Sequence, residues 1–216
     1  MSSSIELEVR RHSPRSPWTY ALLDRRQREL GREIRQTGRA GALLLSELAP
    51  VITIGRRTPK EDLLLNEAEL ARLGVERIET DRGGLATYHG PGQWVLFAVD
   101  RLERLTGDRR GVRLAVRALL RIAMETAARF GIEAGIRQGV ELGVWSPRGK
   151  LAAVGIRVEQ GILLHGLSLN VRRTPQSFVG LRPCGLDAAV DFLERDFEEV
   201  RQVLAEIALR ELWNQR

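Results

Sequence analysis

Apolar residues recur along this chain with two periods, which predict strands and helices in succession. Residues 5–10 alternate between apolar and polar side chains, as in a half-exposed strand. Apolar residues then return every three or four positions, which predicts a helix that starts at Ser16-Pro17 and stops at Gly38. The runs 42–48 and 51–55 are almost wholly apolar and indicate two buried strands.

The rest of the chain continues this mixture and ends in a helix. Further strands are predicted at residues 75–80, 94–100, 140–146, 150–158 and 162–171. Further helices are predicted at residues 66–74, 111–130 and 196–213, each with a capping residue or a glycine at one end. Because strands outnumber helices, and hairpins mix with long helices, we expect an α/β (α+β) fold with a mixed β-sheet flanked by helices. No repeat or linker divides the 216 residues, so one domain is expected.

The balance of charge narrows the kinds of partner. There are 34 Lys and Arg residues against 28 Asp and Glu, and the formal net charge of +6 favours nucleic acid, anionic lipid or an acidic protein. Basic residues never run longer than two and aromatic residues make up only 5% of the chain, which disfavours nucleic acid. No uncharged apolar stretch reaches the roughly 18 residues of a membrane helix, so no membrane partner is expected.

Sulfur and imidazole are scarce. Cys184 is the one cysteine, which excludes an internal disulfide and a cysteine-based zinc site and suits a reducing, cytoplasmic location. No H-E-x-x-H pattern joins His12, His89 and His165, so no metal site is expected. The N-terminal residues contain no apolar core of the kind found in secretory signals, and secretion is therefore not expected.

Two residues are candidates for chemistry. Cys184 lies in a loop before a helical segment, where backbone N–H groups can stabilise a thiolate; the other interpretation is a small buried hydrophobe. Lys150 is one of two lysines in a chain that uses Arg at 32 of its 34 basic positions. An amine can lose or relay a proton and a guanidinium cannot, which favours a functional lysine. The alternative for Lys150 is a solvated residue at the end of a hairpin turn. Lys60 lies in a polar loop and has no comparable neighbourhood.

A glycine-rich segment at residues 82–93 is the third candidate. It matches neither a P-loop nor G-x-G-x-x-G, but its glycines allow the backbone to approach a ligand closely. A plain turn between two strands is the alternative. His89 in this segment is expected to be a structural or a positioning residue, and His165 a core residue within a strand.

Four segments, in this order, resemble the motifs of the octanoyl-acyl-carrier-protein:protein octanoyltransferases, also called lipoyl/octanoyl transferases. They are RGGLATYHGPGQ (82–93), GKLAAVGIRV (149–158), HGLSLNV (165–171) and RPCGL (182–186). The resemblance covers residues from about 40 to 195. It implies a single catalytic domain over residues 1–216 with the lipoate/biotin protein ligase fold, in which a smaller second sheet accompanies the mixed sheet.

The resemblance also implies a set of site residues. Cys184 would be the nucleophile that carries the acyl thioester, and Lys150 its partner, with no metal and no cofactor. The acyl pocket would be lined by Arg82, Gly83, Gly84, Leu85, Ala86, Thr87, Tyr88, His89, Ala153, Val154, Gly155, Gly166, Leu167 and Ser168. Leu85-Ala86 replaces a pair that usually begins with Gln, which predicts a more apolar wall.

The implied reaction moves an octanoyl group from octanoyl-acyl carrier protein to the ε-amine of a lysine on an acceptor. The implied acceptors are the lipoyl domains of 2-oxoacid dehydrogenases and the glycine cleavage H protein. Lys150 would first support the thiolate and later accept the proton of the attacking amine. Backbone N–H groups at Gly83–Gly84 or beside Cys184, with His89 as a positioning group, are candidate oxyanion donors.

Three alternatives stay open at this point. An ATP-dependent lipoate or biotin ligase would use the same fold without a thiol, and it is disfavoured by the cysteine–lysine pair and by the lack of a recognisable nucleotide loop. A non-catalytic module that binds anions or nucleic acid would explain the charge alone. A family member that binds without catalysis is disfavoured because both Cys184 and Lys150 are present.

Overall fold

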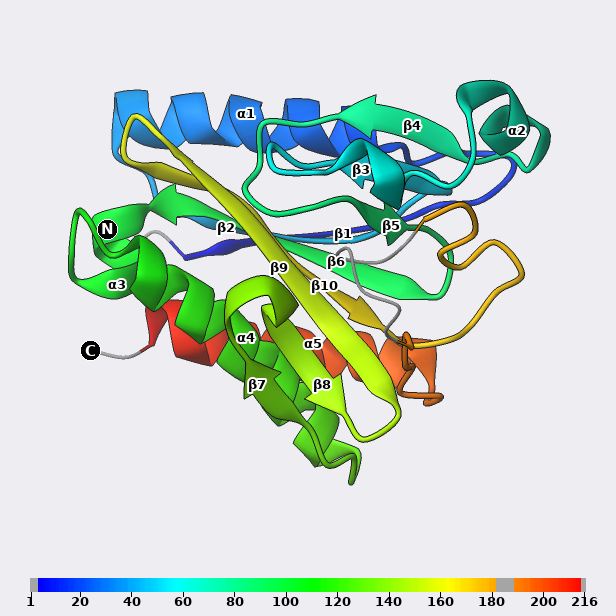
Figure 1. Ribbon diagram of the computed structural model, residues 1–216. Helices are drawn as coiled ribbons and strands as arrows, with labels where there is room; N and C mark the ends of the chain where they lie inside the picture. Colours follow the sequence, from blue (N-terminus) through cyan, green and yellow to red (C-terminus); the bar gives the residue numbers. More distant parts are fainter. Residues whose placement is uncertain (1–3, 182–188, 215–216) are drawn as a thin grey trace.

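The computed structural model describes residues 4–181 and 189–214, and its main feature is a mixed sheet of seven strands (Figure 1). β1 and β2 run parallel, and the other neighbours along the sheet are antiparallel. The mixed sheet expected from the sequence is therefore confirmed. In spatial order the strands are β1 (Glu6–Arg11), β2 (Ala42–Glu47), β6 (Gln93–Arg101), β10 (Ile162–Asn170), β9 (Gly149–Glu159), β8 (Gly143–Ser146) and β7 (Gly135–Arg137).

Helices cover both faces of this sheet. α1 (Tyr20–Thr37) lies on one face, and α4 (Val112–Arg129) and α5 (Phe197–Trp213) lie on the other (Figure 1). Alternate residues of the central strands explain this arrangement, because successive side chains of a strand point to opposite faces. On β6, Leu96 belongs to the apolar cluster formed with α4 and α5, whereas Phe97 and Val99 belong to the cluster formed with α1.

A second, smaller sheet lies beside the first, as the resemblance implied. Its strand order is β4 (Glu76–Glu79), β3 (Val51–Ile54) and β5 (Thr87–His89). The short helix α2 (Glu67–Arg72) packs on it through Leu70 and begins with a capping box between Asn66 and Glu69. The apolar runs 42–48 and 51–55 are both strands, as predicted, but they belong to different sheets.

The structure differs from the sequence prediction at several boundaries. α1 begins at Tyr20 and not at Pro17, because the backbone of Ser16 pairs with Ser13 and Thr19 provides the N-cap. The run 140–146 starts as the 3-10 helix η2 (Gly139–Glu141) before β8. The strands β5 and β7, the helix α3 (Leu102–Thr106) and the 3-10 helix η1 (Lys60–Asp62) were not predicted.

No helix in the described ranges has both the length and the apolar composition needed to cross a membrane.

Candidate active site

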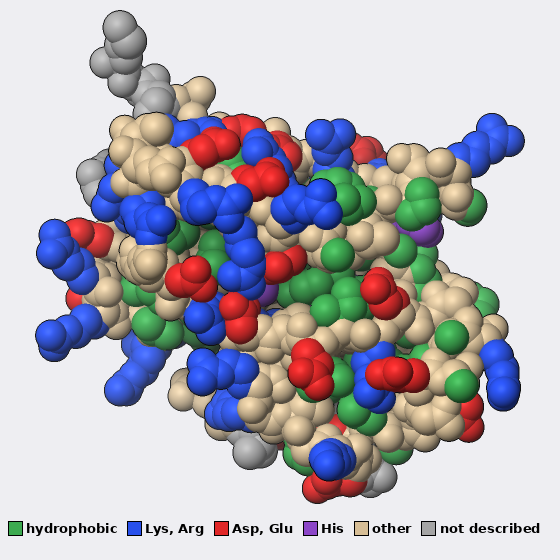
Figure 2. Space-filling view, turned by 90° about the horizontal axis from the view of Figure 1, so that it is seen from above, with side chains coloured by type: hydrophobic (Ala, Val, Ile, Leu, Met, Phe, Trp, Pro, Cys, Tyr) green, Lys and Arg blue, Asp and Glu red, His purple; other side chains and the backbone are tan. Residues whose placement is uncertain are grey.

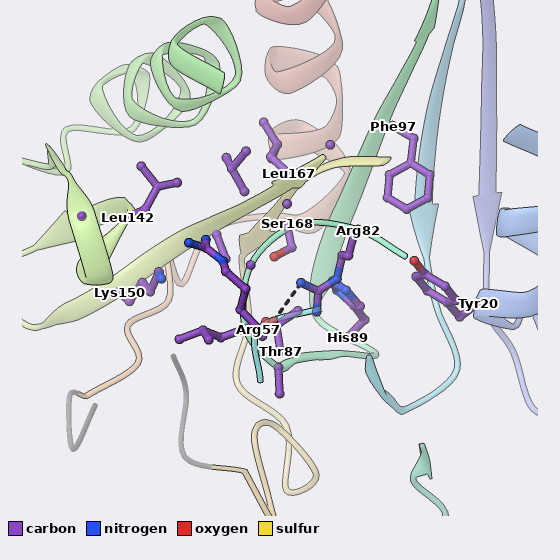
Figure 3. Close-up of a pocket in the computed structure, with 18 residues that line it drawn as sticks. Tyr20, Arg57, Arg82, Thr87, His89, Phe97, Leu142, Lys150, Leu167 and Ser168 are labelled. Carbon is purple, nitrogen blue, oxygen red and sulfur yellow. Dashed lines mark hydrogen bonds between the residues drawn. The ribbon is translucent and has the colours of Figure 1, made fainter. Parts of the chain in front are cut away.

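A cavity of about 420 Å³ lies between the main sheet and the glycine-rich segment that precedes β5 (Figure 3). Lys150 and Leu142 are at one end of it, and Tyr20 and Phe97 are at the other. Seen from the side of α1 and β4, the surface has a hollow in which hydrophobic side chains are exposed among charged ones (Figure 2).

Small residues form the floor of the cavity. Ser168 of β10 lies opposite Ala153 of β9, and Gly166 lies opposite Gly155. Opposite residues of an antiparallel pair share a face, so these four residues form one surface, which we call the floor. All four line the cavity, and larger side chains here would fill it. On the next strand, β6, Phe97 lies opposite Gly166.

The segment 82–86 forms the roof, and Arg82 holds it in place. The Arg82 side chain is 6% exposed and donates to the carbonyl oxygens of Thr53 and Leu85, both at 2.8 Å. The Gly83 N–H donates to Ile156 O on β9 at 3.0 Å. A Cβ atom at Gly55 would lie 2.4 Å from Gly84 O, so the roof requires a glycine there. Arg82 lines the cavity. The guanidinium N–H groups of Arg82 and the backbone N–H of Gly83 are, however, bonded to carbonyl oxygens of the protein.

Lys150 is buried at the start of β9, at the opposite end from Phe97. Its side chain is 6% exposed, and its Nζ lies 5.5 Å from the ring centroid of Trp145. A Cβ atom at Gly143 would come within 2.4 Å of Lys150 Cε, so glycine on β8 makes the room for this side chain. The amine therefore lines the cavity from within the protein rather than from a solvated hairpin end.

Cys184 lies outside the described residues, but the residues on both sides of that segment are placed. Leu181 pairs with Leu63 in an isolated β-bridge and belongs to the same apolar cluster as the roof residue Ala86. On the other side, the Lys150 N–H donates to Ala189 O at 2.9 Å. Asp191 N–H donates to Lys150 O at 3.0 Å. Cys184 precedes Ala189 by five positions in the sequence, so the chain that carries it returns to the backbone of Lys150.

A chain of hydrogen bonds sets the tautomer of His89. Asn170 Nδ2 donates to the carbonyl oxygens of Lys150 and Asp191, so Asn170 Oδ1 accepts from Gln93 Nε2 at 2.8 Å. Gln93 Oε1 then lies 2.7 Å from His89 Nδ1, and this nitrogen carries the hydrogen because an amide oxygen only accepts. Burial lowers the pKa of His89 to about 3, so the ring is neutral and Nε2 is an acceptor.

These contacts limit which groups can stabilise an oxyanion. His89 in this tautomer has no N–H at Nε2 to donate, and the Gly83 N–H is already bonded to Ile156. From the sequence, the Gly83 N–H was a candidate donor and His89 a positioning group, and neither is free to donate in this arrangement. The remaining candidate oxyanion donors are the backbone N–H of Gly84 and the N–H groups beside Cys184. The groups beside Cys184 lie outside the described residues.

A second polar network surrounds the end of the cavity that Tyr20 and Phe97 line. Gln27 Oε1 accepts from the His165 backbone at 2.7 Å, and Gln27 Nε2 therefore faces His165 Nδ1 at 3.2 Å. Tyr20 also places its hydroxyl 3.1 Å from the same nitrogen. His165 Nε2 is 3.0 Å from Asp81, the residue before the roof segment. His165 is thus buried and bonded on both ring nitrogens, as the core interpretation expected.

Most of the residues implied by the sequence meet around this one cavity. Gly83 belongs to the roof without lining the cavity, and Tyr88 points into the apolar cluster of the small sheet. Among the described residues, sequence reasoning missed five that line the cavity, namely Tyr20, Arg57, Phe97, Gly139 and Leu142. Tyr20 and Phe97 occupy ordinary apolar positions of a helix and a strand, and Arg57 is one of 32 arginines, so the sequence holds no signal that separates them. The implied residues that line it are Arg82, Gly84, Leu85, Ala86, Thr87, His89, Lys150, Ala153, Val154, Gly155, Gly166, Leu167 and Ser168.

Solved structures share this fold at low sequence identity. Lipoate-protein ligase A bound with ATP aligns with a TM-score of 0.72 and 14% identity, over 96% of this chain and 85% of that one. The bi-partite lipoate protein ligase of Thermoplasma acidophilum aligns with a TM-score of 0.65 and 18% identity, over 96% of this chain and 84% of that one. The lipoate ligase type of fold expected from the sequence is confirmed.

Sequence comparison gives closer relatives. An octanoyltransferase of Magnetococcus marinus is 39% identical over 171 residues, which cover 79% of this chain and 76% of that protein. An octanoyltransferase of Alkaliphilus metalliredigens is 37% identical over 174 residues, which cover 80% and 75%. The model of the lipoyl protein ligase A/B catalytic domain matches residues 22–207. The chain therefore belongs to the lipoyl protein ligase A/B catalytic domain family.

Proposed function

We propose that this protein is an octanoyltransferase that moves an octanoyl group from octanoyl-acyl carrier protein to a lysine ε-amine on a lipoyl domain. The observation that carries the proposal is a buried lysine, Lys150, at one end of an apolar cavity, with its backbone bonded to the segment that follows Cys184. The relatives named octanoyltransferase, at 37% and 39% identity, support the same activity.

The first step is a thioester exchange. The Cys184 thiolate attacks the octanoyl carbonyl, the bond to the carrier sulfur breaks, and the carrier leaves as a thiol after it takes up a proton. The exchange replaces one thioester by another, so the acyl group is stored without an added energy source. The Lys150 ammonium can stabilise the thiolate before attack and supply the proton to the leaving sulfur.

The second step forms an amide. The acceptor lysine must lose a proton before its amine can attack the acyl-enzyme. Solvent takes this first proton. As the amine attacks, Lys150, neutral after the first step, accepts the second proton of the amine, the C–S bond breaks, and the Cys184 thiolate returns. One amine therefore acts first as an acid and then as a base, which an arginine cannot do.

The cavity supports an alkyl chain as the transferred group. Its walls include Leu85, Ala86, Val154 and Leu167, and the polar groups of Arg82 and His89 are largely bonded to the protein. Burial of the seven carbons beyond the carbonyl of an octanoyl chain, at about 0.8 kcal/mol each, is worth roughly 6 kcal/mol. The cavity thus provides binding energy for the part of the donor that does not react.

Acidic partners fit the charge of the protein. Acyl carrier proteins and lipoyl domains are typically acidic, and the net charge here is +6. We take the lipoyl domains of 2-oxoacid dehydrogenases and the glycine cleavage H protein as the acceptors.

The decisive experiment is intact-mass analysis after the protein is mixed with octanoyl-acyl carrier protein. We expect an octanoyl adduct that hydroxylamine removes, that maps to Cys184, and that is absent from Cys184→Ser. Addition of a lipoyl domain should discharge the adduct and octanoylate its lysine. No adduct, together with ATP-dependent modification of the lipoyl domain by Cys184→Ser, would instead assign the protein as a ligase.

A further inference from the structure

The end of the cavity opposite Lys150 is closed by two packed aromatic rings. Phe97 and Tyr20 are 4% and 2% exposed and meet edge to face, with ring centroids 6.4 Å apart. His165 holds both, because the Tyr20 hydroxyl bonds its Nδ1 and the Phe97 ring lies edge-on to it at 5.3 Å. Since His165 is itself bonded to Gln27 and Asp81, this end of the cavity is rigid.

The floor leads from Lys150 directly to Phe97. The first cross-strand row of the floor is Ala153 and Ser168, and the second, about 7 Å farther along the strands, is Gly155 and Gly166. Phe97 continues this second row on β6. Because the other two members of the row are glycines, Phe97 is the member of this row that presents a side chain to a ligand moving away from Lys150.

The roof closes the other route. A Cβ atom at Gly155 would lie 2.9 Å from Gly83 O and 3.2 Å from Arg82 Cδ, so the roof rests directly on β9 at this point. The Gly83 N–H bond to Ile156 O seals the same place one residue farther on. Lys150 lies at one end of the cavity and Phe97 and Tyr20 lie at the other (Figure 3). A chain that entered beside Lys150 and could not continue along β9 would therefore end against these two rings.

We propose that Phe97 ends the acyl channel and sets the longest acyl chain that the enzyme transfers. The proposal rests on the proposed function, and it names the residue that determines specificity within that reaction. Phe97 lies on the face of β6 that α1 covers, so removal of its ring should extend the channel farther under α1. Each further methylene buried there is worth about fourfold in binding, so two should improve the use of a decanoyl donor roughly tenfold or more relative to octanoyl.

The test compares carrier protein loaded with hexanoyl, octanoyl, decanoyl or dodecanoyl groups. The rate constant kcat/KM for acylation of Cys184 is measured for the wild type, Phe97→Ala and Phe97→Leu. We expect both variants to raise the ratio of decanoyl to octanoyl transfer, with the larger rise for alanine. Phe97→Trp should move the preference the other way, toward hexanoyl, and it keeps the proposal testable if truncated variants do not fold.

Val99→Ala is the matched control. Val99 lies two residues farther along β6 on the same face, is fully buried under α1 and does not line the cavity. Its truncation should lower stability without changing the order of donors. An unchanged donor order in every Phe97 variant, or an equal shift in Val99→Ala, would overturn the proposal. If the wild type transferred none of the four groups, the proposed function itself would fail, which is a distinguishable result.

Discussion

The two lysines of this chain have opposite surroundings. Lys150 is buried, lines the cavity and lies near Trp145, whereas Lys60 is exposed in the 3-10 helix η1. The other 32 basic residues are arginines, which can pair with a carboxylate but cannot release a proton. The structure thus places Lys150 at the cavity and Lys60 on the surface, and the need for an amine at position 150 stays a prediction.

Replacement of Lys150 by arginine should separate the two steps of the reaction. Lys150→Arg keeps a positive charge for the thiolate, and solvent can protonate the leaving carrier thiolate, so acylation of Cys184 should continue. Transfer to the lipoyl domain, which needs a base, should fall about a hundredfold or more. Single-turnover mass measurements of the acyl-enzyme and of the acceptor check both steps. Lys150→Met should lose both, and Lys60→Arg should lose neither. Normal turnover by Lys150→Arg would remove the general-base role.

His89 should make the stability of the protein depend on pH. Its pKa is about 3 in the fold because of burial, and it is near 6.5 when unfolded, so the unfolded chain binds the proton between these values. The contribution is fully present above pH 6.5 and is lost as the pH falls toward 3, at up to about 1.4 kcal/mol per pH unit. His89→Asn keeps a donor for Gln93 and should show a shallower loss between pH 6.5 and 5 in urea unfolding. Equal slopes for the two proteins would contradict a buried neutral imidazole.

Among the helices and strands, the hydrophobic periodicity predicted the long elements, whose formation depends mainly on the local sequence. The long helices α1, α4 and α5 and the strands β2, β6, β9 and β10 lie where the pattern predicted them. The strand β5 was missed because only three residues of a glycine-rich segment pair with β3. β7 and α3 are also short, and such elements are stabilised by neighbours that are distant in the chain.

The residues of the candidate site that belong to sequence motifs could be predicted. Those that reach the cavity only through tertiary contacts could not. The segments around Gly84, Gly155 and Gly166 are recognisable in sequence, and the structure brings them to one cavity. Tyr20 reaches the same cavity only because α1 crosses β6 and β10, a tertiary contact that no local pattern encodes. Cys184, which the sequence suggests as the partner of Lys150, lies outside the described residues. The proximity of the two side chains therefore stays a prediction.

Gly143 on β8 links the geometry of an element to the position of Lys150. A methyl group at Gly143 would lie 2.4 Å from Lys150 Cε and 2.6 Å from Ala152 O, so the strand or the lysine must move. Gly143→Ala should cost about 1–3 kcal/mol of stability and lower transfer at least tenfold. Gly135→Ala on neighbouring β7 is the control, because a Cβ atom there meets nothing within 4 Å. Thermal unfolding and transfer rates measured together would show whether the two glycines differ as expected.

Across the whole molecule, many arginines form ion pairs with carboxylates of the same chain. Arg26 pairs with Glu6 and Glu8, and Arg28 pairs with Asp24 and Asp81, so these charges hold α1 to β1 and to the start of the roof. Arg57 differs, because it is exposed and borders the cavity. The net charge of +6 belongs to the chain as a whole, and groups of both signs surround the hollow (Figure 2).

This excess charge should act on the encounter with the carrier protein rather than on the chemical step. Salt shortens the Debye length from about 30 Å at 0.01 M to about 8 Å at 0.15 M and so weakens attraction between a basic and an acidic surface. We expect kcat/KM for octanoyl-acyl carrier protein to fall roughly tenfold between 20 and 300 mM NaCl, with kcat nearly unchanged. An uncharged donor, the octanoyl thioester of N-acetylcysteamine, enters the same cavity without a charged surface and should react at a rate that salt hardly changes. If both donors lost activity equally, salt would be acting on the catalytic residues, and the net charge would have no role in docking.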